Sequence, residues 1–207
     1  MEYLFLIVVL ILSIMIHEIA HGAVANYLGD PTAKYAGRLT LNPLKHIDPI
    51  GSIILPLFLI IMGSSFLIGW AKPVPVNPYN LRDKKWGSVK VSLAGPAVNF
   101  AIAVIFGLLL RFFPALIVSL NLFPMFAYIV FINLLLAVFN LLPIPPLDGS
   151  HILFGFLPPS MQGIKTFLNQ FGIVLLLFVV FFLFPGVIYL INWIFILITN
   201  CSLYYFL

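Results

Sequence analysis

Residues 3–28 read YLFLIVVLILSIMIHEIAHGAVANYL, an apolar run long enough to cross a membrane as one helix. Glu18 is its one acidic side chain, and the run contains no Lys or Arg. A carboxylate and two imidazoles are costly to place in hydrocarbon, and by default such groups mark a functional site. The run therefore predicts a membrane-spanning helix that carries a polar site.

The two histidines of this run, His17 and His21, are four residues apart. A helix places both imidazoles on one face, where they can reach one metal ion. Glu18 lies about 100° further round the helix, where a carboxylate can accept a proton from water beside the metal. The pattern is typical of a zinc site. The alternatives are a chance match, or histidines that only hydrogen-bond within a helix bundle.

The composition indicates an integral membrane protein, because 63% of the 207 residues are hydrophobic and 8% are charged. We expect one membrane domain, residues 1–207, with a catalytic core at about 1–155 and two C-terminal transmembrane helices within 167–203. The single cysteine, Cys201, excludes an internal disulfide and a cysteine-based zinc site. The ten Lys and Arg residues lie in loops, as expected for residues that set membrane orientation, and do not indicate nucleic-acid binding.

The pattern along the chain predicts an all-α membrane protein. Residues 32–49 are polar and broken by Gly and Pro, which predicts a short extended or β hairpin near the site. Pro96 is expected in the first turns of its helix, where proline is tolerated, and Asn99 is expected to hydrogen-bond between helices. About five transmembrane helices are predicted, at residues 3–28, 91–113, 121–142, 167–184 and 186–200.

A hydrolytic zinc ion usually has three protein ligands, often two histidines and a carboxylate. Among the other acidic residues, one is at the N-terminus and three are in polar loops, whereas Asp148 follows an otherwise apolar helix. Asp148 is therefore the best third ligand by elimination. The alternative interpretation is an Asp-Gly turn that ends the helix.

These residues resemble the site-2 protease family, zinc metalloproteases that cleave within the membrane (peptidase family M50). The resemblance covers about residues 10–155, and it corresponds to a short form without the PDZ or CBS domain of many relatives. It implies one Zn²⁺ per chain held by His17, His21 and Asp148, with Glu18 as general base and Asn140 near the substrate or the developing oxyanion. It is carried by HEIAHG at 17–22, GWAKPVPVN at 69–77, AGPAVN at 94–99 and NLLPIPPLDG at 140–149.

The depth of the site predicts the topology. His17 is about 20 Å along the first helix, so the site lies inside the bilayer but nearer the far surface. If residues 50–68 crossed completely, Asp148 would emerge on the opposite side from His17, so we expect this segment to be re-entrant. Nine basic residues then share one side, with Arg111 opposite, instead of a division of six against four. That side is expected to be cytoplasmic, with the N-terminus outside and the C-terminus inside.

The predicted activity is hydrolysis of peptide bonds in or near transmembrane segments of membrane proteins. The expected partners are a transmembrane protein substrate and the lipid bilayer, with no nucleic acid. A zinc or proton-coupled transporter is one alternative, but residues 167–198 contain no ionisable acid, base or histidine. The other is a catalytically silent relative that binds membrane proteins, against which the intact Glu18 argues. His151 and His46 are left without an assigned role.

Overall fold

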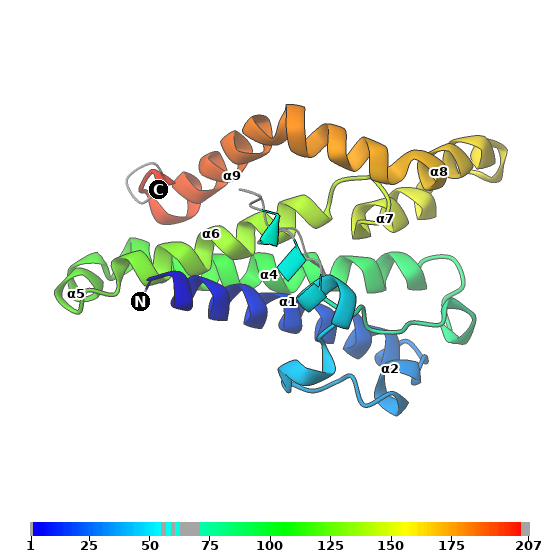
Figure 1. Ribbon diagram of the computed structural model, residues 1–207, viewed down its shortest axis with the longest axis horizontal. Coiled ribbons are helices and arrows are strands. Elements are labelled where there is room, and N and C mark those ends of the chain that lie inside the picture. Colours follow the sequence, from blue (N-terminus) through cyan, green and yellow to red (C-terminus); the bar gives the residue numbers. More distant parts are fainter. Residues whose placement is uncertain (1, 55–56, 59–60, 63–70, 204–207) are drawn as a thin grey trace.

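The computed structural model of the protein describes residues 2–54, 57–58, 61–62 and 71–203. Three long helices, α1 (Glu2–Tyr27), α4 (Gly87–Phe112) and α6 (Phe123–Asn140), pack against one another and run in alternating directions (Figure 1). The other elements are α2 (Thr32–Tyr35), η1 (Pro43–Lys45), η2 (Pro49–Ile54), η3 (Pro78–Asn80), α5 (Pro114–Ser119), α7 (Asp148–Phe156), η4 (Pro159–Met161), α8 (Gln162–Phe178), η5 (Val179–Leu183) and α9 (Phe184–Thr199).

Helix α1 follows the predicted apolar run closely. The helix contains no proline, so it continues without a break. It ends just before Gly29, which adopts a φ of +107°. Glycine tolerates this left-handed backbone, which most other residues do not. The N–H of Asp30 then donates to Ala25 O at 2.9 Å, which closes the helix end. The helix therefore ends in a turn at residues 28 and 29.

Helix α4 begins earlier than predicted, at Gly87. The carboxylate of Asp83 accepts the N–H groups of Lys85 and Trp86 just before this helix begins. Pro96 is therefore inside the helix, and its predicted place in the first turns is wrong. A proline there cannot donate to the carbonyl four residues earlier. That carbonyl belongs to Ser92, which is buried beside the site described below.

The predicted count of five spans is not confirmed, because in the described part of the chain four helical stretches are long and apolar enough to cross a membrane. The fourth, Pro159–Thr199, is one run of 41 residues, so residues 167–184 and 186–200 belong to a single stretch. Pro185 lies at the start of α9, directly after the π-helical turn η5, so the helical run continues past it. The start of α1 and the end of α9 lie at the same end of the bundle (Figure 1). The prediction that the termini lie on opposite sides of the membrane is therefore not confirmed.

The bundle carries large apolar side chains on its outer surface, as expected of a protein surrounded by lipid. Examples are Ile7 on α1, Ile105 on α4 and Ile173 on α8, which are 54%, 57% and 69% exposed. A soluble protein would not leave so much contiguous apolar surface in water. This surface supports the interpretation that the long helices span the membrane.

The segment between α1 and α4 differs from its prediction where it is described. Residues 32–49 contain a short helix and a 3₁₀ turn, and none of the residues described in this segment forms a strand, so the β hairpin is not confirmed. The predicted re-entrant segment, 50–68, lies mostly outside the described residues. Residues 71–77 are extended without being paired in a sheet, and they lie close to α1.

Three buried polar side chains connect the helices in the middle of the bundle. Asn133 on α6 donates its amide to Ser13 Oγ on α1 at 3.0 Å and to Ile129 O at 2.9 Å. Asn99 on α4 donates its amide to Asn133 Oδ1 at 2.9 Å. Side-chain amides commonly join helices in this way inside a membrane, so the predicted interhelical role of Asn99 is confirmed.

Candidate active site

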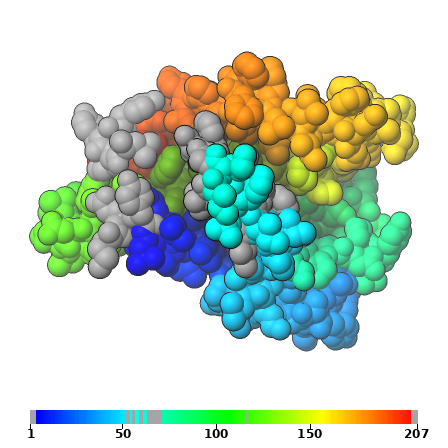
Figure 2. All heavy atoms as spheres, viewed as in Figure 1, coloured from blue at the N-terminus to red at the C-terminus, as the bar shows by residue number. Residues whose placement is uncertain are grey.

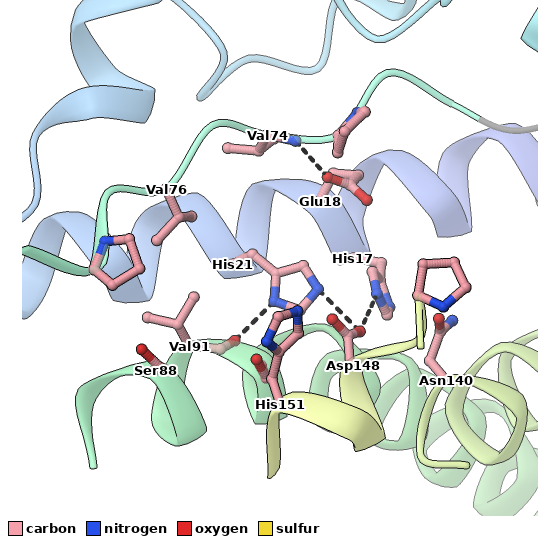
Figure 3. Close-up of a pocket in the computed structure, with 14 residues that line it drawn as sticks. His17, Glu18, His21, Val74, Val76, Ser88, Val91, Asn140, Asp148 and His151 are labelled. Carbon is pink, nitrogen blue, oxygen red and sulfur yellow. Dashed lines mark hydrogen bonds and ion pairs between the residues drawn. The ribbon is translucent and has the colours of Figure 1, made fainter. Parts of the chain in front are cut away.

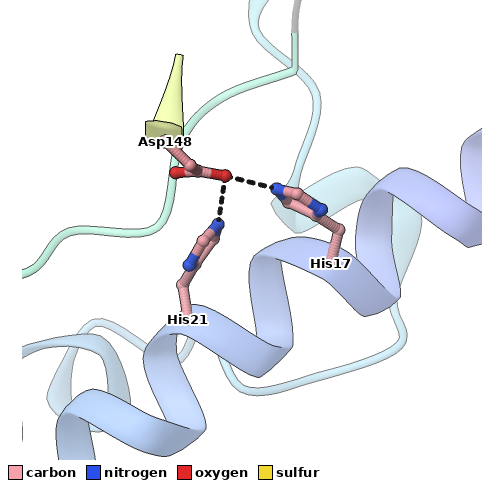
Figure 4. A group of neighbouring side chains, drawn as sticks. All are labelled: His17, His21 and Asp148. Carbon is pink, nitrogen blue, oxygen red and sulfur yellow. Dashed lines mark hydrogen bonds and ion pairs between the residues drawn. The ribbon is translucent and has the colours of Figure 1, made fainter. Parts of the chain in front are cut away.

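His17 and His21 on α1 meet Asp148 at the first turn of α7 (Figure 4). Asp148 Oδ2 lies 3.0 Å from His17 Nε2 and 3.2 Å from His21 Nε2. The ligand atoms of these three residues all lie within 4.8 Å of one another. The structure thus brings Asp148, which is 131 residues after His17 in the sequence, beside the two histidines of α1, as the sequence predicted for a metal site.

The orientation of the His17 ring can be traced through the buried amides. Asn133 must point its NH₂ group at the Ile129 carbonyl, so its oxygen accepts from Asn99. Asn99 therefore turns its own oxygen toward His17, whose Nδ1 lies 2.8 Å away. An oxygen at this position requires a proton on Nδ1. The lone pair of the neutral ring is then on Nε2.

His21 is also protonated on Nδ1, but its hydrogen-bond partner is a backbone carbonyl. Its Nδ1 lies 2.7 Å from the backbone oxygen of Val91 on α4, and a carbonyl can only accept. Nδ1 of His21 is therefore protonated, and Nε2 carries the lone pair in the neutral ring. A histidine whose second nitrogen donates to a carbonyl or an amide in this way is the usual arrangement around a metal.

The three atoms that face one another, His17 Nε2, His21 Nε2 and Asp148 Oδ2, consequently require a cation. Two nitrogen lone pairs then face one carboxylate oxygen, which is unfavourable unless positive charge lies between them. Two imidazoles and a carboxylate match the donor set of a hydrolytic zinc ion. These residues fit the metal.

Gly95 on α4 leaves the space in which the histidines lie. A Cβ atom at this position would be 2.5 Å from His17 Nε2 and 2.5 Å from His21 Nε2. No side chain can be accommodated at such distances unless the rings move. The glycine therefore allows α4 to approach the two imidazoles directly, and the sequence analysis had not assigned it this role.

Glu18 lies on α1 between the two histidines but points toward a different element (Figure 3). Its Oε2 accepts the backbone N–H of Val74 at 2.7 Å. Val74 belongs to the extended segment 71–77, in which Pro73 and Pro75 have no N–H to donate. The Val74 amide thus holds the carboxylate of Glu18 at the edge of the site, a contact that the sequence did not reveal.

A cavity of about 380 Å³ opens beside these groups. Glu18, His17, His21 and Asp148 line it, and segment 71–77 contributes Val74 and Val76 (Figure 3). The remaining labelled residues in Figure 3 show how the wall continues onto α4, α6 and α7: Ser88, Val91, Asn140 and His151. The cavity is therefore large enough for a short piece of extended peptide beside the three metal-site residues.

Asn140 and His151 both line this cavity, as the sequence suggested for Asn140. The amide of Asn140 donates to Leu136 O at 3.0 Å, so its side chain is anchored on its own helix. His46 lies elsewhere: its Nε2 donates to Thr40 O at 2.9 Å within the segment after α1. His46 is thus separate from the group formed by His17, His21 and Asp148.

The comparisons with known proteins agree with one another. The sequence model of Peptidase family M50 matches residues 115–179. YwhC of Bacillus subtilis (strain 168) is 40% identical over 187 residues, which cover 87% of this chain and 81% of YwhC. Rip2 of Mycolicibacterium smegmatis is 36% identical over 164 residues, 78% of this chain and 61% of the longer Rip2. MJ0392 of Methanocaldococcus jannaschii is 30% identical over 95 residues, 45% of this chain and 27% of MJ0392.

The names of all three relatives describe them as zinc metalloproteases. No solved structure matches the chain. The similarity to YwhC extends over most of both proteins, which is enough to establish the family. The chain belongs to peptidase family M50 and is a zinc metalloprotease of the membrane.

Proposed function

We propose that this protein hydrolyses peptide bonds in or near transmembrane segments of other membrane proteins. One observation carries the proposal: His17 Nε2 and His21 Nε2 converge on Asp148 Oδ2 beside a cavity that Glu18 also lines. The same helix, α1, is one of the candidate membrane spans. A hydrolytic donor set on a spanning helix favours a substrate that is itself in the membrane.

In the proposed mechanism, His17, His21 and Asp148 hold the zinc ion. When bound there, zinc supplies a Lewis acid that polarises the scissile carbonyl and acidifies water. Glu18 accepts the proton of the attacking water and returns it to the leaving amine. The Val74 N–H keeps the Glu18 carboxylate oriented for this transfer. Asn99 and Val91 keep the two imidazoles oriented.

The residues of the cavity wall are proposed to bind the substrate. Asn140 is proposed to donate to the substrate carbonyl, because its amide lies at the cavity edge. A helical substrate keeps its backbone groups in internal hydrogen bonds, so it must unwind locally before it can reach Glu18. An extended peptide then fits between segment 71–77 and α7, the two elements that flank the cavity.

We further propose that the active site lies nearer the cytoplasmic face and that residues 50–68 are re-entrant. Support comes from the positive charges, nine of which share one side under this topology. Cysteines at positions 45 and 84, in a Cys201→Ser background, should then react with an impermeant thiol reagent from the cytoplasmic side only. Labelling of the two positions from opposite faces would contradict the re-entrant topology.

The activity is tested with Glu18→Gln in the full chain. The purified protein is reconstituted into vesicles with a single-span membrane protein as substrate, and cleavage is measured alongside zinc content. We expect this variant to lose about 10²- to 10⁴-fold in rate, because the proton acceptor is gone. Its zinc content should not change, because His17, His21 and Asp148 remain.

Three results would contradict the proposal in different ways. Normal cleavage by Glu18→Gln would exclude Glu18 as the base. Cleavage of a soluble peptide but never of a membrane-inserted one would exclude the substrate class. Zinc flux across the vesicle membrane without any cleavage would favour the transporter alternative.

A further inference from the structure

His151 lines the catalytic cavity, yet the mechanism proposed above gives it no task (Figure 3). It lies on α7, three residues after Asp148, and residues three apart in a helix are neighbours on one side of it. Both residues line the same cavity. The first turn of α7 thus presents a carboxylate of the metal site and a further imidazole to the same space.

The two residues between them hold this turn of α7 against the end of α6. Gly149 and Ser150 are both buried. A Cβ atom at Gly149 would lie 2.2 Å from Leu141 O, so the backbone approaches closely because no side chain is present. Ser150 Oγ donates to Leu147 O at 2.7 Å. The backbone that carries His151 is therefore firmly placed beside the cavity.

The imidazole of His151 is free, unlike the other imidazoles of the chain. The rings of His17, His21 and His46 are each held by a hydrogen bond to a carbonyl or amide oxygen. Neither ring nitrogen of His151 has a hydrogen-bond partner among the residues that the structure describes, and its ring contact is with Phe154, at a centroid distance of 6.5 Å. His151 is exposed, so a molecule in the cavity can reach it.

His151 is separate from the metal ligands. Among the described residues, the group whose ligand atoms all lie within 4.8 Å of one another contains His17, His21 and Asp148, but not His151. A catalytic zinc ion needs three protein ligands and keeps a further position for water or substrate. His151 is therefore available to act on the substrate rather than on the metal.

Peptide-bond hydrolysis places negative charge on the carbonyl oxygen when water adds to the carbonyl carbon. Preorganised N–H donors aimed at this oxygen lower the barrier, and such sites often contain more than one donor. Asn140 offers one N–H, because the other donates to Leu136 O at 3.0 Å. A neutral imidazole carries an N–H in either tautomer. His151 can therefore supply another donor without a change in its own charge.

We propose that His151 is a catalytic residue: its ring N–H donates to the scissile carbonyl oxygen as that oxygen becomes negative, alongside Asn140. This role rests on the peptidase function proposed above. Glu18, the proposed proton acceptor, belongs to α1 and is held by segment 71–77, whereas His151 belongs to α7 (Figure 3). The acceptor and the donor thus reach the substrate from different walls of the cavity.

The test compares His151→Leu, which removes the ring N–H, with His151→Gln, which keeps a side-chain N–H. Gln162→Leu is the control, because it also removes a polar side chain from an exposed residue but lies outside the cavity. Zinc content and melting temperature of each full-length, zinc-loaded protein are measured first in detergent.

Two ligands then separate the transition state from ordinary binding. The first is a blocked Ala-Leu-Leu-Ala peptide in which a phosphinate replaces the central amide bond, because its tetrahedral, anionic group resembles the transition state. The second has a methylene group at the same position and lacks the charged oxygen. Calorimetry gives both dissociation constants. The values of kcat and KM are measured with the single-span substrate in vesicles.

We expect His151→Leu to lower kcat about 100-fold and to weaken phosphinate binding by a similar factor, because one donor to the charged oxygen is lost. Its zinc content, its KM and its affinity for the methylene peptide should stay within about twofold of the wild-type values, because these do not depend on that oxygen. His151→Gln should keep at least about tenfold more of the phosphinate affinity than His151→Leu. Gln162→Leu should behave as the wild type does.

Unchanged phosphinate binding in His151→Leu would overturn the proposal. An equal loss of affinity for both peptides would overturn it as well, because His151 would then act only in substrate binding or packing. A loss of zinc would show that His151 serves the metal instead. Absence of cleavage by the wild type would contradict the proposed function, whereas the two peptides would still decide whether His151 binds the charged oxygen.

Discussion

Two carboxylates of this protein, the buried Asp30 and the half-buried Asp148, have opposite surroundings. Asp30 is fully buried at the end of α1 and accepts from the N–H of Asn77 at 2.6 Å and from the Asn80 amide at 2.9 Å. Thr32 donates to it through both its backbone N–H and its hydroxyl group. Asp148 instead faces two imidazole nitrogens whose lone pairs point toward it.

The difference teaches how a structural carboxylate can be told from a metal ligand. Asp30 is surrounded by hydrogen-bond donors and needs nothing more, so it fixes the turn between α1, α2 and η3. Asp148 faces two nitrogen atoms that can themselves bind a cation, as expected of the metal ligand proposed above. Both residues are carboxylates shielded from solvent to different degrees, and the direction of the neighbouring protons is what distinguishes them.

The largest effect is expected from replacing each carboxylate by its amide. Asp148→Asn should weaken zinc binding by at least about 100-fold, because a charged ligand is lost. Asp30→Asn should retain zinc, because it touches none of the three residues. Zinc content per chain is measured by mass spectrometry after purification. Loss of zinc in both variants, or in neither, would remove the distinction between the two sites.

A smaller effect is expected from replacing Asn99, the hydrogen-bond partner of His17 Nδ1. Asn99→Ala removes the acceptor of the Nδ1 proton and should lower zinc affinity about 10- to 100-fold. Asn192→Ala is the matched control, because Asn192 is also a buried amide in a membrane helix but bonds Leu203 N. A chelator competition gives both affinities. Equal losses would show that Asn99 acts only through packing.

The space beside the histidines provides a third test. Gly95→Ala should destabilise the protein by about 1–3 kcal/mol even with the metal removed, because the methyl group overlaps both rings. Gly163→Ala is the control, since nothing lies within 4 Å of a Cβ there. Thermal unfolding in the presence of a chelator measures the difference. An unchanged melting temperature in Gly95→Ala would mean that the imidazoles are free to move.

The smallest effect concerns pH. Burial would raise the pKa of Asp30, but hydrogen bonds from Thr32, Asn80 and Asn77 outweigh it and hold the pKa below its ordinary value. A lowered pKa in the folded state gives stability that is present above the unfolded pKa of about 3.9 and is lost as pH falls further. The melting temperature should therefore fall more between pH 5 and pH 3 in the wild type than in Asp30→Asn. Parallel profiles would exclude this contribution.

Much of the site could be predicted because it depends on local geometry. The spacing of His17 and His21 places them on one face of any helix. Asp148 was identified by elimination, because most of the other acidic residues lie in polar loops. The outer contacts could not be predicted in the same way. The acceptor of His21 is a backbone carbonyl of Val91, and a backbone atom leaves no trace in the sequence.

The errors in the predicted fold have physical causes as well. Pro96 was expected near the start of its helix because the apolar run begins at Val91, but the helix begins four residues earlier, where Asp83 binds the N–H groups of Lys85 and Trp86. Pro185 was taken as a break between two spans, yet the π-helical turn η5 leads directly into α9 there and the helical run continues. Gly95 and Asn99 belong to the AGPAVN segment that the sequence analysis noted. Their contacts with the histidines become visible only in the packed structure.

The distance in sequence between the two halves of the zinc site has a consequence for biosynthesis. His17 and Asp148 are separated by 131 residues. At ordinary rates of translation the ribosome needs roughly ten seconds to make that stretch, so α1 enters the membrane well before its carboxylate partner exists. Asn99 follows 82 residues after His17, so His17 first lacks both partners and then lacks Asp148 alone. A newly synthesised chain therefore has an incomplete set of metal ligands until α7 has emerged, and proteolysis belongs to the finished protein.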